Sequence, residues 1–177
     1  MKFKLLLLLQ LVSVQLLFTS LAQAKPIIDT RENKVIVRQV INAPANLVWS
    51  QIGRVDGVEN FIPQVFSETS VEGKGLGATR ICKHHDGRTL VEEIVAFDEG
   101  SMTLSYTLLK GGESFPSENI VNTVQVHPIS SKQSMLVWAS KYDDKANTDP
   151  AMTKELNQGA LSYVVAGAKR YIETLTN

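Results

Sequence analysis

Cysteine is almost absent from this sequence, since Cys82 is the only one in 177 residues. A single cysteine excludes an internal disulfide, so the stability of the fold must come from a packed core. A lone cysteine in a strand pattern usually behaves as a small buried hydrophobic side chain. The alternative is a working thiol.

The sequence also lacks clustered metal ligands and an excess of charge of one sign. His84 and His85 point to opposite faces of any strand, and His127 has no ligand-type neighbour at a suitable spacing. Basic and acidic residues both number 18, so nothing favours nucleic acid or an anionic membrane surface. We therefore predict no metal, no other cofactor and no nucleic-acid partner.

The N-terminus has the three parts of a secretory signal peptide. Lys2 and Lys4 form a basic start, residues 5–18 are almost wholly apolar, and Ala22 and Ala24 are small residues at the positions read by signal peptidase. The apolar run is shorter than the roughly 20 residues of a membrane-spanning helix. We expect cleavage after Ala24 and export to the periplasm or the medium, without stable membrane insertion. The alternative is an uncleaved anchor.

The rest of the chain has the size of one domain. Removal of 24 of the 177 residues leaves 153, enough for a single core. Loss of the two lysines of the basic start leaves 16 basic and 18 acidic residues, a formal charge of −2. No repeat, low-complexity tract or linker divides this part. The expected organisation is a signal peptide at 1–24 and one domain at 25–177.

The order of strand and helix signals predicts an α+β fold. β-branched residues at 35–41 indicate a first strand, residues 44–52 suit a short helix, and residues 55–61 suit a second short helix or a turn. From Val65 onward, apolar and polar residues alternate between glycine-containing turns, which is typical of an antiparallel meander.

A long helix is predicted at the C-terminal end. Asp149 suits the N-cap position and Pro150 the first helical position, and apolar residues recur at helical spacing up to Leu175. Several small residues in this helix cost helical stability unless their space is needed: Gly159, Ala160, Ala166, Gly167 and Ala168. A ligand beneath the helix would need that space, and so would close packing of the helix on the sheet.

Two hairpin turns predict which side chains lie side by side. His85-Asp86-Gly87 and Asp98-Glu99-Gly100 both fit a three-residue loop that ends in a left-handed glycine. The first loop places Arg80 opposite Glu92, and the second places Glu92 opposite Tyr106. Because Tyr106 lies on the apolar face of its strand, we expect a buried row in which Arg80 and the Tyr106 hydroxyl stabilise the carboxylate. A two-residue turn would instead leave Arg80 on the solvent face.

This order of elements resembles the helix-grip fold of the START-like or SRPBCC superfamily, which includes pollen-allergen-type proteins, polyketide cyclases and lipid carriers. The resemblance covers residues 34–175 and is carried by segments at 43–49, 71–73 with 77–80, 91–98 and 127–128. It implies a curved antiparallel sheet of about seven strands wrapped on a long C-terminal helix, with two short helices after the first strand.

Within that superfamily, the spacing is most similar to the branch of the plant abscisic-acid receptors and the onion lachrymatory-factor synthase. By this resemblance, Arg80 and Glu92 match the catalytic Arg and Glu of the synthase, and Glu92 matches a ligand-contacting Glu of the receptors. Three further residues match positions that line the receptor cavity: Tyr106, Asn122 and Trp138. Phe66 stands where the receptors have the hormone-pairing Lys, and their gate and latch motifs are missing, so a hormone receptor is not implied.

These observations favour a binding protein that encloses an apolar small molecule (lipid-like, aromatic or polyketide-like) between the sheet and the C-terminal helix. The expected ligand-binding residues are Arg80, Glu92, Tyr106, Asn122, Trp138 and Tyr163. One alternative is an enzyme of cyclase, dehydratase or isomerase type, in which Glu92 is the acid or base and Arg80 stabilises an anion. Another is a structural or interaction module with a filled core. No particular protein partner is predicted.

Overall fold

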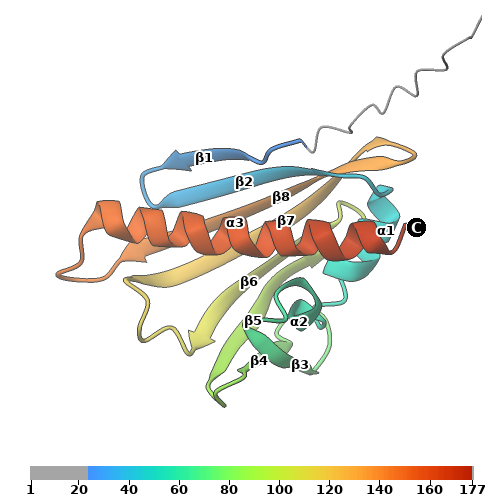
Figure 1. Ribbon diagram of the computed structural model, residues 1–177. Coiled ribbons are helices and arrows are strands. Elements are labelled where there is room, and N and C mark those ends of the chain that lie inside the picture. The colour runs from blue at the N-terminus through green and yellow to red at the C-terminus, as the bar shows by residue number, and fades with distance from the viewer. Residues whose placement is uncertain (1–23, 177) are drawn as a thin grey trace, which may run out of the picture.

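The chain folds into one antiparallel sheet that a long helix crosses (Figure 1). The computed structural model describes residues 24–176, so the expected signal peptide lies almost wholly outside the described residues. The strands are β1 (Ile27–Arg31), β2 (Lys34–Ile41), β3 (Phe66–Glu72), β4 (Thr79–His84), β5 (Thr89–Asp98), β6 (Thr103–Lys110), β7 (Ser117–Ser130) and β8 (Gln133–Asp144). The helices are α1 (Ala45–Ile52), α2 (Val58–Phe61) and α3 (Pro150–Thr174).

Strand order in the sheet is β1-β2-β8-β7-β6-β5-β4-β3. Successive strands from β3 to β8 are neighbours, as a meander requires, and β2 closes against β8. Alternate residues of each strand face α3, because side chains on a strand point to opposite faces in turn. The core forms between this inner face, α1 and α3, and it includes Val37, Leu104, Val124 and Leu136.

The expected α+β helix-grip arrangement is confirmed, with three differences in detail. The sheet has eight strands, because Ile27–Arg31 adds an edge strand paired with β2. Ile27 and Ile28 are exposed in that strand, so it has no buried face and no alternation from which to predict it. The helix expected at 44–52 begins one residue later, with Pro44 as its N-cap. The second short element, expected at 55–61, is helical only over Val58–Phe61.

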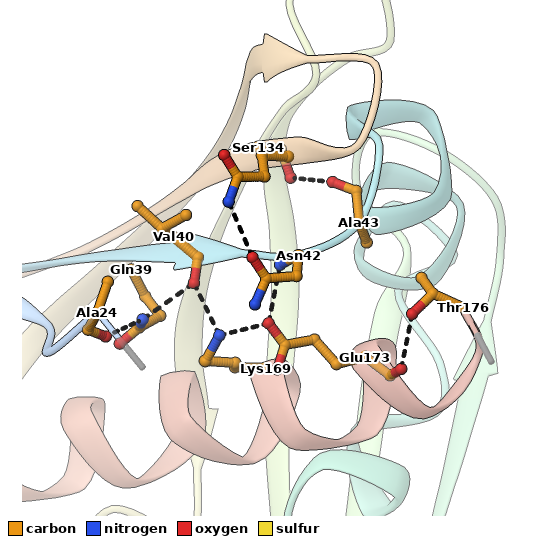
Figure 2. Close-up of polar contacts among 10 residues, drawn as sticks. Ala24, Gln39, Val40, Asn42, Ala43, Ser134, Lys169, Glu173 and Thr176 are labelled. Atoms are coloured by element: carbon orange, nitrogen blue, oxygen red, sulfur yellow. Dashed lines mark hydrogen bonds and ion pairs between the residues drawn. The ribbon is translucent and has the colours of Figure 1, made fainter. Parts of the chain in front are cut away.

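Both ends of α3 are fixed by polar contacts. At its start, Asp149 is the N-cap and its carboxylate accepts a hydrogen bond from the Ala151 amide at 2.9 Å, as expected. Near its end, the buried Lys169 pairs with Glu173 and donates to the Val40 carbonyl at 3.0 Å (Figure 2). Glu173 also accepts from the Asn42 amide at 2.8 Å. These contacts hold the C-terminal end of α3 against the junction of β2 and α1.

The small residues of α3 do not share one role. Gly167 is buried at the crossing of α3 and α2, where an added Cβ would overlap the Phe61 carbonyl oxygen. Gly159 is exposed, and an added Cβ there would have no atom within 4 Å. Close packing on α2 therefore explains Gly167, and nothing in the structure explains Gly159.

Cys82 is fully buried as a free cysteine on β4. Burial raises the pKa of its thiol to about 12, and the negative charge of Glu92 adds to this effect. The thiol therefore stays protonated and unreactive at neutral pH, as the hydrophobic interpretation predicts. Among residues 24–176, no helix is long and apolar enough to cross a membrane, and no group of three or more potential ligand residues could hold a metal ion.

Candidate functional site

A cavity of about 490 Å³ lies between the sheet and the part of α3 that follows its first turn. Its walls come from the inner faces of β4 to β8, from residues 58–66, from the segment 114–116 and from α3, and most of them are apolar. All six residues expected to bind a ligand line this one cavity: Arg80, Glu92, Tyr106, Asn122, Trp138 and Tyr163.

Arg80 and Glu92 form a buried ion pair at one end of the cavity. They lie directly opposite each other on β4 and β5, as the first hairpin loop predicts, and Gly87 has the expected left-handed conformation with φ of 86°. Arg80 Nε and Nη2 both lie 2.7 Å from Glu92 Oε2. The two residues are only 4 and 6% exposed, so each charge depends on the other for compensation.

The prediction that Tyr106 lies opposite Glu92 is wrong. Tyr106 pairs with Ile94, and Glu92 pairs with Leu108. The loop after β5 is longer than three residues, because Asp98 accepts hydrogen bonds from the amides of both Gly100 and Ser101. Met102, with φ of 49°, takes the left-handed position expected for Gly100. A bulge between Ile94 and Ala96 then shifts the register again.

Tyr106 nevertheless contacts the ion pair, through its ring rather than its hydroxyl. The Arg80 guanidinium carbon lies 4.3 Å from the centre of the Tyr106 ring, a cation–π contact. The Tyr106 hydroxyl accepts a hydrogen bond from Trp138 Nε1 at 3.2 Å, and the two rings pack edge to face. The expected stabilisation of the carboxylate by this hydroxyl is therefore replaced by stabilisation of the cation by the ring.

Arg80 has a further partner that the sequence did not indicate. Its Nη1 donates to the carbonyl of Val55, in the loop between α1 and α2, at 3.1 Å. Val55 has φ of 71°, a left-handed conformation that β-branched residues rarely adopt. The strained loop thus directs a carbonyl toward the guanidinium. A single sequence carries no signal for this contact, because the acceptor is a backbone atom.

The charges of the pair shift the pKa of neighbouring groups. Burial is the largest single influence on the pKa of Arg80 and lowers it, but the Glu92 charge, the hydrogen bond to Glu92 and the weaker effects of Tyr106 and Cys82 together outweigh burial, and the net shift of the pKa is upward. Burial raises the pKa of Tyr106, and the Glu92 charge raises it further. Arg80 therefore stays positively charged and Tyr106 stays neutral throughout the physiological range.

One carboxylate oxygen of Glu92 is left available to a ligand. Arg80 contacts Oε2, whereas Oε1 accepts no hydrogen bond from any residue in the described part of the chain. Arg80 itself directs its donors to Oε2 and to the Val55 carbonyl. This end of the cavity consequently offers a ligand one hydrogen-bond acceptor, Glu92 Oε1, whose negative charge is compensated by Arg80. It does not offer the guanidinium as a binding site for an anion, because the nitrogens of Arg80 are already engaged.

Tyr163 marks the opening of the cavity to solvent. It is 42% exposed, and its hydroxyl donates to Gln64 Oε1 at 3.2 Å. Phe115 and Leu156 also line the cavity while remaining exposed. The remaining expected residue, Asn122, lies inside on β7, between Tyr106 of β6 and Ser140 of β8.

Comparison with known proteins identifies related sequences and folds. Residues 33–173 match the family model described as polyketide cyclase/dehydrase and lipid transport. A search of curated protein sequences finds no match.

Solved structures of the same shape come from bacteria and a plant. A Thermobifida fusca protein is 25% identical with a TM-score of 0.64, over 78% of this chain and 93% of its own. XoxI from Bacillus cereus is 19% identical with a TM-score of 0.69, over 81% and 98%. Norcoclaurine synthase from Thalictrum flavum, in complex with dopamine and hydroxybenzaldehyde, is 15% identical with a TM-score of 0.63, over 99% and 96%.

Proposed function

Because this chain belongs to the polyketide cyclase/dehydrase and lipid-transport family, we propose that it is an exported protein that encloses an apolar small molecule. The observation that carries the proposal is the cavity of about 490 Å³ beneath α3. Ligand sites in proteins typically measure about 300–1,000 Å³ and combine apolar walls with a few polar groups. This cavity has that composition, with Glu92 and Arg80 as its charged end.

A cavity of this size between the sheet and α3 argues against a structural module with a filled core. Protein interiors are otherwise close-packed, because each unfilled volume forfeits dispersion contacts. The fold also accommodates small aromatic molecules in norcoclaurine synthase, which shares the shape of this chain at 15% identity. An aromatic or aliphatic occupant of similar size therefore suits the proposal.

The proposal predicts binding of a neutral apolar probe. N-phenyl-1-naphthylamine, which fluoresces in apolar sites, is expected to bind with a Kd on the order of 10 µM, given about 0.4 kcal/mol for each non-hydrogen atom. Leu161→Trp should abolish binding, because Leu161 is a buried wall residue of the cavity on α3 and the larger ring fills the space. Fluorescence titration measures both.

A matched control places the same indole ring outside the cavity. Leu175 is exposed at the C-terminal end of α3, so Leu175→Trp should leave the affinity for the probe unchanged. Equal loss of binding in both variants, or no binding by the native protein, would contradict an accessible apolar cavity.

Enzymatic activity is the second candidate, and the free Oε1 of Glu92 is the observation that favours it. An unpartnered carboxylate oxygen at a cavity wall can take or give a proton, while Arg80 keeps the other oxygen in place. Native mass spectrometry of protein from its own host separates the two functions. A binding protein carries one unchanged molecule, whereas an enzyme supplied with that molecule releases a different one.

Export forms part of the proposal and has its own test. The N-terminus of the mature protein is expected to be Lys25, because Ala22 and Ala24 satisfy the small-residue rule for signal peptidase. Intact-mass measurement and N-terminal sequencing of the exported protein check this. Ala22→Lys should block cleavage, and Ala22→Gly should allow it. Recovery of native protein in the membrane with Met1 still present would contradict cleavage.

A further inference from the structure

Ser117 and Asn157 form a second polar site inside the cavity. Ser117 begins β7, Asn157 lies on α3, and both line the same cavity as the ion pair. The Ser117 hydroxyl is 3.4 Å from Asn157 Oδ1 and 3.3 Å from Nδ2. Only 3% of Ser117 is exposed, so this hydroxyl lies in an environment where polar groups are normally well hydrogen-bonded.

The contact between these two side chains leaves hydrogen-bonding capacity unused. Both distances exceed the 2.7–3.2 Å of a strong N–H···O bond or the shorter range of an O–H···O bond. Asn157 Nδ2 makes its better contact with the Thr153 carbonyl, at 2.8 Å. Asn157 Oδ1 and the Ser117 hydroxyl therefore retain lone pairs, and the hydroxyl proton can turn toward a closer partner.

Asn122 is a further polar side chain on the cavity wall, four positions along β7 from Ser117, with Ile120 between them. It lines the cavity, and its side chain makes no hydrogen bond with any residue between 24 and 176. A half-buried amide without partners is costly unless a solvent molecule or a ligand satisfies it. Three side chains on β7 and α3 thus present hydrogen-bonding groups to whatever occupies the cavity.

The register of the sheet separates this second site from Glu92. Ile94, Tyr106 and Asn122 form one row across β5, β6 and β7. Glu92 lies two residues before this row on β5. Ser117 lies five residues before it on β7, which runs in the same direction, but the bulge between Glu118 and Val121 reduces this to four positions in the sheet, since Ser117 pairs with Asp144 and Asn122 with Ser140. With about 3.3 Å per residue and about 4.8 Å between strands, the Cα atoms of Glu92 and Ser117 are roughly 12 Å apart.

Apolar side chains form the wall between the two polar sites. Leu108 of β6 and Ile120 of β7 face the cavity from the sheet, and Leu161 and Val164 face it from α3. Two polar ends with an apolar middle are therefore built into one cavity.

We propose that the natural occupant is a neutral molecule with a polar group at each end. One end donates a hydrogen bond, as a hydroxyl does, to Glu92 Oε1, and the other end bonds to Ser117 and Asn157. An aliphatic or aromatic middle of about eight carbons spans a distance of roughly 12 Å. This inference rests on the proposed function, because it assumes that the cavity holds a small molecule.

The test compares 1,8-octanediol with 1-octanol as competitors of the fluorescent probe. The second hydroxyl of the diol weakens binding to an apolar site that offers it no hydrogen bond. It is tolerated only where a protein group forms a hydrogen bond with it. The native protein should bind the diol at least as tightly as the alcohol. In the double variant Ser117→Ala/Asn157→Ala, the affinity for the diol should fall about tenfold or more relative to the affinity for the alcohol.

The ratio of the two affinities cancels any general effect of the variant on the fold. Asn46→Ala/Ser50→Ala removes the same atoms from the exposed surface of α1 and should leave the ratio unchanged. If the double variant does not fold, Ser117→Ala alone should shift the ratio in the same direction by a smaller factor.

The outcomes distinguish this inference from the function on which it rests. Preference of the native protein for 1-octanol, or a ratio that Ser117→Ala leaves unchanged, would overturn the two-ended occupant while retaining an apolar binding site. Failure of both competitors and of the probe to bind would instead overturn the proposed function, and this inference with it.

Discussion

Replacing Arg80 by Met is expected to lower the free energy of unfolding by about 3–5 kcal/mol, because it leaves a buried carboxylate without its counter-charge. Arg80 supplies both guanidinium nitrogens that contact Glu92 Oε2 at 2.7 Å. It also contacts the Val55 carbonyl and the Tyr106 ring. Urea denaturation at neutral pH, followed by circular dichroism, measures the loss.

Adding Glu92→Gln to this variant should recover much of the lost stability, because the uncompensated charge is gone. The exposed pair of Arg88 and Asp86 on the neighbouring hairpin turn is a matched control, with Nε and Oδ2 2.8 Å apart. Arg88→Met should leave the free energy of unfolding almost unchanged, because solvent screens that exposed pair. If the changes at Arg80 and Glu92 are small and additive, the pair is not coupled in a buried site.

The pairing of Arg80 with Glu92 was predictable because one local feature determines it. Gly87 adopts the left-handed conformation that closes a three-residue loop, and the strands on either side then have only one register. The position of Tyr106 was not predictable in this way. The loop between β5 and β6 depends on the Asp98 side chain, which accepts hydrogen bonds from two backbone amides. It also depends on Met102, which has a left-handed backbone conformation that non-glycine residues seldom adopt.

The cavity itself could be anticipated only through the resemblance to a known family. Alternation along the strands indicates which residues face inward, but it does not indicate whether the inward side chains meet those of α3 or leave space. Ser117 and Asn157 illustrate the difficulty, since they are far apart in the sequence and become neighbours only when α3 crosses β7. The carbonyl of Val55 belongs to the same class of long-range contacts.

The two glycines of α3 also show that packing cannot be predicted from sequence alone. Gly159 and Gly167 both weaken a helix by about 1 kcal/mol relative to alanine, so sequence reasoning treats them alike. Packing distinguishes them, because Gly167 lies against the backbone of α2 and Gly159 faces open space. The two residues therefore form a natural pair for a packing test on one helix.

Gly167→Ala is expected to destabilise the protein by about 3 kcal/mol or more, despite the better helix propensity of alanine. The added Cβ would overlap the carbonyl oxygen of Phe61 and lie 2.9 Å from its carbonyl carbon. Neither atom can move unless α2 shifts away from α3. Because Val58, Ile62 and Val65 line the cavity on this side, the variant should also weaken binding of the fluorescent probe.

Gly159→Ala is the control, and it should raise the free energy of unfolding by up to about 1 kcal/mol, because an exposed alanine stabilises the helix and meets no neighbour. Opposite signs for the two substitutions, measured by thermal and urea denaturation, would establish that α3 packs directly on α2 at Gly167. Equal and small effects would mean that α3 can slide on α2. The cavity would then have no fixed roof, since the same helix carries Asn157, Leu161 and Val164 over it.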